Sequence, residues 1–357
     1  MRVLHVVAAR PNFMKVAAVF MALKEYDGIE QVLVHTGQHY DFDMSEVFFR
    51  QLEIPAPDVN LGVGSDSHAR QTAEMMMRLE PVLVERKPDL VLVYGDVNST
   101  LAAALVCSKL LIRVGHVEAG LRSFDRTMPE EINRLLTDQV SDLLFTPSED
   151  GSANLVREGV AQEKVHLVGN VMIDTLVRFL GRTPPEPLAN LPSRYALLTL
   201  HRPSNVDDLT WLRELVETLE AIGRELPIIF PIHPRTRQRL SSCGLLRLES
   251  NGLRFLNPLP YLEFLSLQRG ASVVITDSGG IQEETTFLHV PCLTMRENTE
   301  RPITVTEGTN ILLGRSCQRL RQELGKILAG EVKDGSVPAL WDGHAAERVA
   351  EIVRAFL

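Results

Sequence analysis

The stretch LVLVYGDVNSTLAAALVCSKLLIRVGHVEAG, residues 90–120, contains the pattern that decides the fold of this chain. An apolar run, LVLVY, is followed by an amphipathic segment and then by a second β-rich run, RVGHV. The first run does not alternate apolar with polar residues, which is typical of a parallel strand covered by helices on both faces. The stretch therefore predicts a strand, helix and strand of a parallel α/β sheet.

The same alternation recurs along the chain and predicts two doubly wound α/β domains. We expect the first domain at residues 1–170. The pattern restarts after the Pro-rich segment TPPEPLANLPSRY at 183–195, and we expect the second domain at residues 171–340. The last segment, 341–357, has helical spacing and can close the second domain or cross back onto the first.

Composition narrows the class of protein. The 357 residues are 45% hydrophobic, which is enough to bury two cores, and the net charge of -9 with no Lys/Arg-rich run argues against nucleic acid as a partner. The first apolar run is too short for a signal peptide, and none approaches the about 20 apolar residues of a membrane span. We expect a cytoplasmic protein without a membrane partner.

Patterns for cofactors and metals are missing from the sequence. No G-x-G-x-x-G follows the first strand, and Gly325-Lys326 is followed by Ile327 rather than by Ser or Thr. The cysteines lie far apart without a C-x-x-C motif, so we expect buried thiols and neither disulfides nor a zinc site. We predict no cofactor and no metal. The cysteines are Cys107, Cys243, Cys292 and Cys317.

Polar residues follow the predicted strands, where open parallel sheets bind their ligands. After the strand SVVITD, the Ser278-Gly279-Gly280 turn offers backbone N–H groups at a helix start, which suits a phosphate or diphosphate. Glu284, about one turn later, could accept hydrogen bonds from a ribose. The alternative is an ordinary strand-to-helix turn. The other strand-end residues are Arg10, the turn at 37–39, Asp96, Glu118, His201 and His233.

The motifs AARPNFMK, YGDVNSTLAAAL, HVEAGLRSFDRTMPEEINR, GNVMIDTL, LTLHRPSNVD, PIHPRT and TDSGGIQEET occur in this order. Together, over about residues 2–314, they resemble the non-hydrolysing UDP-N-acetylglucosamine 2-epimerases. The resemblance implies two Rossmann-like domains in a GT-B arrangement, with UDP held mainly by the second domain and the sugar in the cleft. It also implies a homodimer that interconverts UDP-N-acetylglucosamine and UDP-N-acetylmannosamine, supplying activated sugars for cell-surface polysaccharide.

Such a reaction needs carboxylates rather than a redox cofactor. The C2 hydrogen of the sugar is not next to a carbonyl, so UDP must leave C1 as the C2 proton departs, giving a 2-acetamidoglucal. The family's catalytic residues fall on Asp96, Glu118, Glu130 and His201, and we expect Asp96 and then Glu118 to carry the C2 proton step. The alternative for Glu130 is a helix start with an i,i+4 ion pair to Arg134.

The resemblance also supplies binding residues. Arg10, Lys15 and Arg301 would bring positive charge to the diphosphate, although Lys15 could be a solvated surface lysine. Phe264 matches a residue near uracil, and its alternative is the core. The predicted binding set is Arg10, Lys15, Arg134, Phe264, Ser278, Gly279, Gly280, Glu284 and Arg301.

Several positions depart from the family pattern. Asn12 replaces an acid, Pro203 replaces an arginine and Leu259 replaces a glutamine, which puts regulation and the precise sugar in doubt. Many relatives are activated by a second UDP-N-acetylglucosamine. Asp41 and Pro203 stand at that site here, and a carboxylate repels a diphosphate while proline has no N–H, so we predict that this activation is lost.

Other functions remain open from the sequence. A 2-epimerase of a modified UDP-sugar, such as a diacetamido uronate, shares all these motifs. A hydrolysing epimerase would release free sugar and UDP. A GT-B glycosyltransferase would need an acceptor and has no reason for convergent carboxylates in its first domain, and a non-catalytic nucleotide-sugar sensor would bind without exchange at C2.

Overall fold

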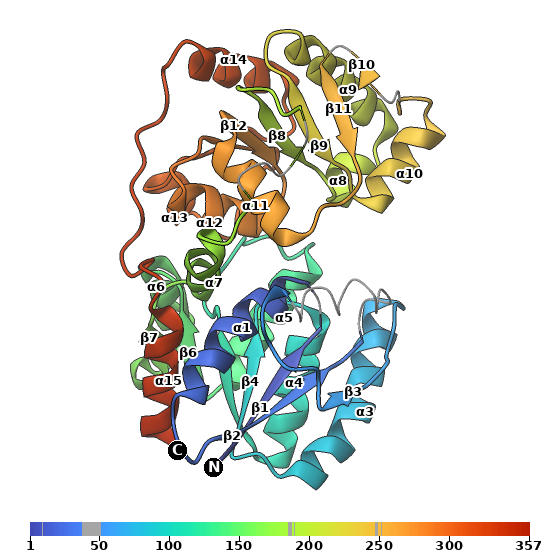
Figure 1. Ribbon diagram of the computed structural model, residues 1–357. Coiled ribbons are helices and arrows are strands. Elements are labelled where there is room, and N and C mark those ends of the chain that lie inside the picture. The colour runs from blue at the N-terminus through green and yellow to red at the C-terminus, as the bar shows by residue number, and fades with distance from the viewer. Residues whose placement is uncertain (9, 38–50, 185–187, 189, 247–248, 251) are drawn as a thin grey trace. The chain divides into compact units, whose positions relative to one another are not determined.

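The computed structural model describes residues 1–8, 10–37, 51–184, 188, 190–246, 249–250 and 252–357. The chain forms two compact units, one of Met1–Arg178 with Ala339–Leu357 and one of Phe179–Pro338 (Figure 1). Each unit is a mainly parallel sheet with helices packed on it, which confirms the predicted fold class. Within the described residues, no helix is both long enough and apolar enough to cross a membrane.

The first unit contains a 7-stranded sheet in the order β3-β2-β1-β4-β5-β6-β7, and each pair of neighbouring strands is parallel. The strands are β1 Arg2–Val7, β2 Glu30–His35, β3 Val59–Asn60, β4 Leu90–Tyr94, β5 Arg113–Val117, β6 Leu143–Thr146 and β7 Val165–Leu167. The helices are α1 Arg10–Lys24, α3 His68–Arg86, α4 Asn98–Leu110, α5 Pro129–Val140, α6 Glu149–Arg157, the 3-10 turn Gln162–Lys164, α7 Val171–Leu180 and α15 Ala345–Phe356.

The second unit contains another 7-stranded sheet, in the order β10-β11-β9-β8-β12-β13-β14, in which only β10 is antiparallel to its neighbour among the strands described. The strands are β8 Ala196–Thr199, β9 Ile228–Pro231, β10 Glu249–Ser250, β11 Leu253–Leu256, β12 Val273–Thr276, β13 Cys292–Thr294 and β14 Asn310–Leu312. The helices are α8 Pro203–Val206, α9 Leu209–Gly223, α10 Pro234–Ser242, α11 Tyr261–Gly270, α12 Gly279–Phe287, α13 Ile303–Thr306 and α14 Cys317–Leu328.

Burial explains why β4 reads as an unbroken apolar run. Every residue of this central strand is buried. Val91 and Val93 pack into one apolar cluster with Leu79 and Leu83 of α3. The residues between them point to the other face of the sheet, which is buried as well, so no position of the strand favours a polar side chain.

The first unit extends beyond the boundary that the sequence suggested at residue 170. It runs to Arg178, inside α7, rather than ending before that helix. The Thr175 hydroxyl of α7 donates to the carbonyl of Met14 in α1 at 2.6 Å, which attaches α7 to the first unit. The Pro-rich segment that marked the change of domain lies after this helix.

The C-terminal helix α15 belongs to the first unit and packs against α1, as Figure 1 shows in red and blue. The Asp174 carboxylate of α7 accepts hydrogen bonds from the N–H groups of Ala345 and Ala346 at 3.1 and 2.6 Å. Burial raises the pKa of Asp174 to about 6, although these hydrogen bonds act against the shift. Of the two positions considered for the last helix, the structure has the one on the first unit.

The cysteines are free thiols, as expected from their spacing. Cys107, Cys292 and Cys317 are buried, and Cys243 is half-buried. Burial raises the pKa of the Cys107 thiol to about 12 and that of Cys292 to about 11, so both are protonated and unreactive at neutral pH.

Candidate functional site

Asp96 and Glu118 follow neighbouring strands of the first unit. Tyr94 of β4 lies opposite Val117 of β5, so both carboxylates leave the sheet at the same edge. Glu118 has a φ of 73°, in the left-handed region that is unfavourable for a residue with a side chain. Its N–H donates to the carbonyl of Phe145 at 3.1 Å, which helps to hold this backbone. Strained backbone of this kind is concentrated at functional sites.

Lys15 forms a buried ion pair with Glu118. Its side chain is only 5% exposed, which excludes the solvated lysine that the sequence left open. Gly95 makes room for the pair, because a Cβ there would lie 2.7 Å from Lys15 Nζ and 3.0 Å from Glu118 Oε2. The structure therefore places Lys15 beside a predicted catalytic carboxylate.

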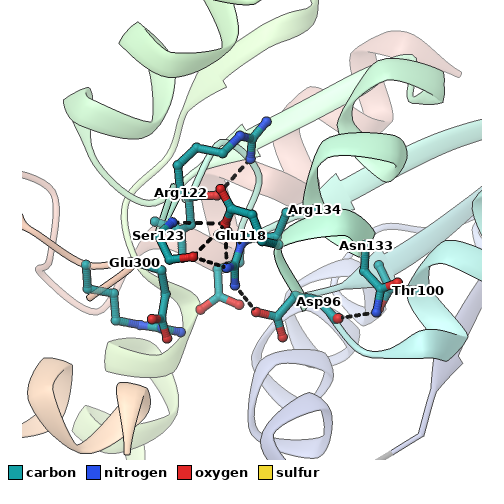
Figure 2. A network of polar contacts seen from close by, with 12 residues as sticks. Asp96, Thr100, Glu118, Arg122, Ser123, Asn133, Arg134 and Glu300 are labelled. Carbon is teal, nitrogen blue, oxygen red and sulfur yellow. Dashed lines mark hydrogen bonds and ion pairs between the residues drawn. The ribbon is translucent and has the colours of Figure 1, made fainter. Parts of the chain in front are cut away.

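Arg134 lies beside the second carboxylate, Asp96. Figure 2 shows its guanidinium directed at the Asp96 carboxylate, with which it forms an ion pair, while Asn133 donates to the Asp96 carbonyl at 2.8 Å. Arg134 is almost completely buried, whereas the Asp96 side chain is 27% exposed. Asp96 is therefore fixed by a buried cation and still reaches the surface.

Glu131, rather than Glu130, holds Arg134 from within α5, at 2.7 Å. It also accepts hydrogen bonds from the N–H groups of Ser123 and Phe124 at 2.9 and 3.0 Å. Burial raises the pKa of Glu131, but these hydrogen bonds and Arg134 outweigh it and keep the pKa below the ordinary value. The sequence missed this role, although a spacing of i,i+3 to Arg134 could have indicated it. Glu130 is half-buried beside it, and its catalytic role stays a prediction.

A buried charged network that the sequence did not predict lies within the same unit. His116 Nδ1 is 2.6 Å from Asp138, and Arg122 is 2.7 Å from the other oxygen of that carboxylate. Burial raises the pKa of Asp138, but His116 and Arg122 outweigh it and hold the pKa below the ordinary value. His116 Nε2 lies 2.8 Å from the carbonyl of Gly95, next to Asp96.

In the second unit, His201 follows β8 and is oriented by Asp277, which follows the neighbouring strand β12. The His201 Nδ1 is 3.0 Å from the Asp277 carboxylate, and the His201 side chain is 45% exposed. Asp277 is fully buried and also accepts from the Arg202 N–H at 2.9 Å. Burial raises its pKa, but His201, Asn205 and Arg202 outweigh it and the pKa is below the ordinary value. Asp277 therefore leaves Nε2 of His201 available to a ligand.

The predicted anion turn starts the helix α12. Ser278 is its N-cap residue, and the Ser278 N–H donates to the Thr276 hydroxyl at 3.0 Å, so that N–H is already used. Gly279 lies against the buried charged groups of Arg301 and Glu300. A Cβ at this position would lie 2.5 Å from Arg301 Nη1 and 2.7 Å from Glu300 Oε1. The turn therefore keeps its helix-start geometry, with Gly279 and Gly280 as the candidate N–H donors.

Arg301 has two carboxylate partners that the sequence did not predict. Its Nε is 2.9 Å from Glu283, and its Nη1 is 2.5 Å from Glu300. Glu300 also pairs with Arg296 at 2.6 Å. Burial raises the pKa of Glu300, but Arg301 and Arg296 outweigh it and hold the pKa well below the ordinary value. The charge that Arg301 could offer a diphosphate is thus partly balanced within the unit.

Glu284 and Phe264 lie on α12 and α11. The Tyr261 hydroxyl donates to Glu284 at 3.1 Å, and Glu284 is buried. Phe264 packs against an apolar cluster that includes Leu267 and Val274, in agreement with a packing role, and its role beside a base stays a prediction.

Some predictions concern parts of the chain that lie outside the described residues. Arg10 begins α1, but its side chain is not among the described ones. Asp41, the carboxylate expected to prevent binding of a second UDP-sugar, also lies outside them, and Pro203 begins α8. Loss of activation by a second substrate molecule stays a prediction, which initial rates at increasing substrate would test.

Comparison with known proteins agrees with this geometry. The family described as UDP-N-acetylglucosamine 2-epimerase matches residues 21–354. A UDP-N-acetylglucosamine 2-epimerase of Methanococcus maripaludis is 45% identical, over 98% of this chain and 97% of the relative. A UDP-2,3-diacetamido-2,3-dideoxy-D-glucuronate 2-epimerase of Pseudomonas aeruginosa is 43% identical, over 98% of this chain and 99% of the relative.

A solved structure gives the same result. The UDP-GlcNAc 2-epimerase of Methanocaldococcus jannaschii, in complex with UDP-GlcNAc and UDP, has a TM-score of 0.92 and 42% identity, covering 99% of this chain and 100% of the other. These findings confirm the resemblance drawn from the motifs. The chain belongs to the UDP-N-acetylglucosamine 2-epimerase family.

Proposed function

We propose that this chain interconverts UDP-N-acetylglucosamine and UDP-N-acetylmannosamine without hydrolysing them. A carboxylate takes the proton from C2, the C2–H electrons form a C1=C2 double bond, and the C1–O bond breaks so that UDP leaves with its electrons. The 2-acetamidoglucal then receives a proton on the other face of C2, and UDP adds back to C1. The step is redox-neutral, so it needs no nicotinamide.

One observation carries this proposal: Asp96 and Glu118 leave the ends of adjacent strands, each paired with its own buried cation. A base must be held within hydrogen-bond reach of the proton that it accepts. Lys15 and Arg134 would serve this purpose, and Glu130 would assist from the start of α5. A binding protein would have no need for two such acids at one edge of a sheet.

The second unit would hold the nucleotide. The start of α12 offers N–H groups and the positive end of a helix dipole to the diphosphate. Glu284, held by Tyr261, would accept hydrogen bonds from the ribose hydroxyls. His201, oriented by Asp277, would donate to the departing diphosphate, and a donor aimed at developing charge is an effective form of catalysis. A UDP-sugar as the ligand is supported by the structural relative, which was solved in complex with UDP-GlcNAc and UDP.

A second candidate substrate is a UDP-diacetamido uronate. It is favoured by the Pseudomonas aeruginosa relative, whose identity of 43% is close to the 45% of the archaeal N-acetylglucosamine enzyme. Both substrates undergo the same change at C2, so the acid/base groups would have the same task. Comparing kcat/KM for the two sugars with one enzyme preparation would decide between them.

Proton NMR of UDP-N-acetylglucosamine with the enzyme in D2O tests the proposed reaction. We expect UDP-N-acetylmannosamine with deuterium at C2, formed with no added acceptor and with no free sugar. Product that retains its original C2 hydrogen would disprove the elimination, free N-acetylmannosamine would indicate hydrolysis, and binding without exchange would indicate a sensor.

We further propose that the enzyme works as a cytoplasmic homodimer and supplies sugars for surface polysaccharide. These points follow from the family resemblance rather than from any contact within one chain. Light scattering of the purified protein would measure the assembly, and deletion of the gene would reveal a polysaccharide defect. A monomer at working concentrations would disprove the dimer.

A further inference from the structure

The turn that carries Asp96 is held by side chains at each of its carbonyl groups. Asn12 donates to the carbonyl of Tyr94 at 2.7 Å, and Asn133 donates to that of Asp96 at 2.8 Å. Between them, the Gly95 carbonyl is bonded by His116 of β5, the strand that ends immediately before Glu118. His116 therefore connects the two strands whose ends carry the proposed catalytic acids.

Each ring nitrogen of His116 lies within hydrogen-bond distance of an oxygen atom. A carbonyl oxygen only accepts, so Nε2 carries a proton toward Gly95. Nδ1 meets Asp138, whose carboxylate is kept ionised by Arg122 at 2.7 Å and also only accepts. His116 thus bridges the Asp138 carboxylate and the Gly95 carbonyl through its two ring nitrogens.

Asp138 extends this connection to the turn that carries Glu118. Its Oδ2 accepts from the N–H of Gly120, two residues after Glu118, at 3.2 Å. Gly120 cannot be replaced by a larger residue, because a Cβ there would lie 2.3 Å from the carbonyl oxygen of Gly151. One buried ion pair, His116 with Asp138, therefore contacts the residue before Asp96 and the loop just after Glu118.

We propose that the His116–Asp138 pair is a positioning pair that fixes Asp96 relative to Glu118 and thereby couples proton removal on one face of C2 to proton return on the other. This inference rests on the proposed function, because it assigns the pair a task in that reaction. Inversion at C2 needs one acid on each face at the correct separation, whereas removal and return of the proton on the same face needs only one acid. A less well-fixed distance between Asp96 and Glu118 should therefore slow inversion at C2 more than exchange of the C2 hydrogen with solvent.

The test measures two outcomes in D2O with His116→Gln and Asp138→Asn: deuterium in recovered UDP-N-acetylglucosamine, and deuterated UDP-N-acetylmannosamine. We expect a loss of about 10²-fold in kcat, as small displacements of catalytic groups cause, with little change in KM. The ratio of exchanged substrate to inverted product should rise in both variants. A role only in folding would lower both products together and leave their ratio unchanged, because the ratio does not depend on the folded fraction.

Asp142→Asn is the matched control, because Asp142 accepts from the N–H of Val114 at 2.9 Å, at the opposite end of the same strand. It should keep the wild-type ratio. An unchanged ratio in Asp138→Asn, which preserves the size of the side chain, would overturn the inference even if His116→Gln fails to fold. Wild-type enzyme that shows neither exchange nor inversion would instead overturn the proposed function.

Discussion

The polar sites at the strand ends of the two units differ in the sign of the buried charge that supports them. The buried partners are cations in the first unit and a carboxylate in the second. In the first unit, the proposed catalytic carboxylates are paired with buried cations: the Asp96 side chain is 27% exposed beside Arg134, and Glu118 is itself buried with Lys15. In the second unit the acid itself is buried, and Asp277 supports the 45% exposed His201. The comparison teaches that similar doubly wound sheets can hold, at a strand end, either a carboxylate beside a buried cation or an imidazole beside a buried carboxylate.

The largest effect should follow from removing the proposed bases of the first unit. Asp96→Asn and Glu118→Gln should each lower turnover by about 10²-fold or more, which is the usual loss for a positioned acid or base. UDP should still bind with near-normal affinity, as measured by calorimetry, because these residues do not belong to the second unit. Asp89→Asn, which affects a carboxylate bonded to the N–H of Arg2 at 2.7 Å, should keep wild-type turnover.

The next effect should come from the second unit and alter binding. Glu284→Ala should weaken UDP binding by about 10- to 100-fold, because hydrogen bonds to a charged group contribute about 1.5–3 kcal/mol. Calorimetry with UDP measures this, and Glu323→Ala, which breaks a surface pair with Lys326, serves as the control. Weak UDP binding by Asp96→Asn together with normal binding by Glu284→Ala would reverse the assignment of the two units.

Alanine substitutions at two glycines of the first unit distinguish the effect of backbone strain from the effect of steric clashes with neighbouring side chains. Gly95→Ala should lower the turnover number by about 10-fold, because the added Cβ would lie 2.7 Å from Lys15 Nζ and would displace the ion pair of Lys15 with Glu118. Gly159 has a similar backbone, with φ of 83° against 64° for Gly95, but nothing lies within 4 Å of its Cβ. Gly159→Ala should therefore lose only the roughly 1–2 kcal/mol of left-handed strain. Equal turnover per folded molecule in both variants would contradict the crowding argument, with the folded fraction measured by circular dichroism.

Local patterns were sufficient to predict the sheets and the strand-end acids. The unbroken run of β4 follows from burial on both faces, and the residues after parallel strands gather at one edge of a sheet, which led to Asp96, Glu118 and His201. These inferences need only spacing along the chain. The roles assigned to these residues remain to be tested by the variants above.

What the sequence did not reveal depends on pairing between distant segments. Asp138 is 22 residues from His116 along the chain, and no pattern of spacing identifies two residues on different elements as partners. Glu131 is an exception, because its i,i+3 spacing to Arg134 could have indicated its role, but its hydrogen bonds to the N–H groups of Ser123 and Phe124 could not be predicted from spacing. The extent of the first unit was missed for the same reason, since Asp174 bonds to a residue 171 positions later.

The smallest effect concerns pH, and it involves two buried carboxyls, Asp174 and Glu300, whose pKa values are shifted in opposite directions. The pKa of Asp174 in the first unit is raised from 3.8 to about 6, mainly by burial, whereas that of Glu300 in the second lies well below its ordinary value of 4.5. A raised pKa means that the folded protein binds the proton more tightly, so the contribution of Asp174 to stability is full below pH 3.8 and is lost as pH rises through about 6. Glu300 contributes above its unfolded pKa and loses that contribution as pH falls.

Asp174→Asn removes the first titration, so the difference in melting temperature between wild type and this variant should move in favour of the variant as pH rises from 4 to 6. The change should be a few degrees at most, because one kcal/mol shifts the melting temperature of a domain of this size by roughly 2–4 °C. Glu347→Gln, at an exposed position of α15 near the same helix start, should show no such trend. A difference between wild type and Asp174→Asn that is constant across this range would show that Asp174 titrates at its ordinary pKa in the folded protein.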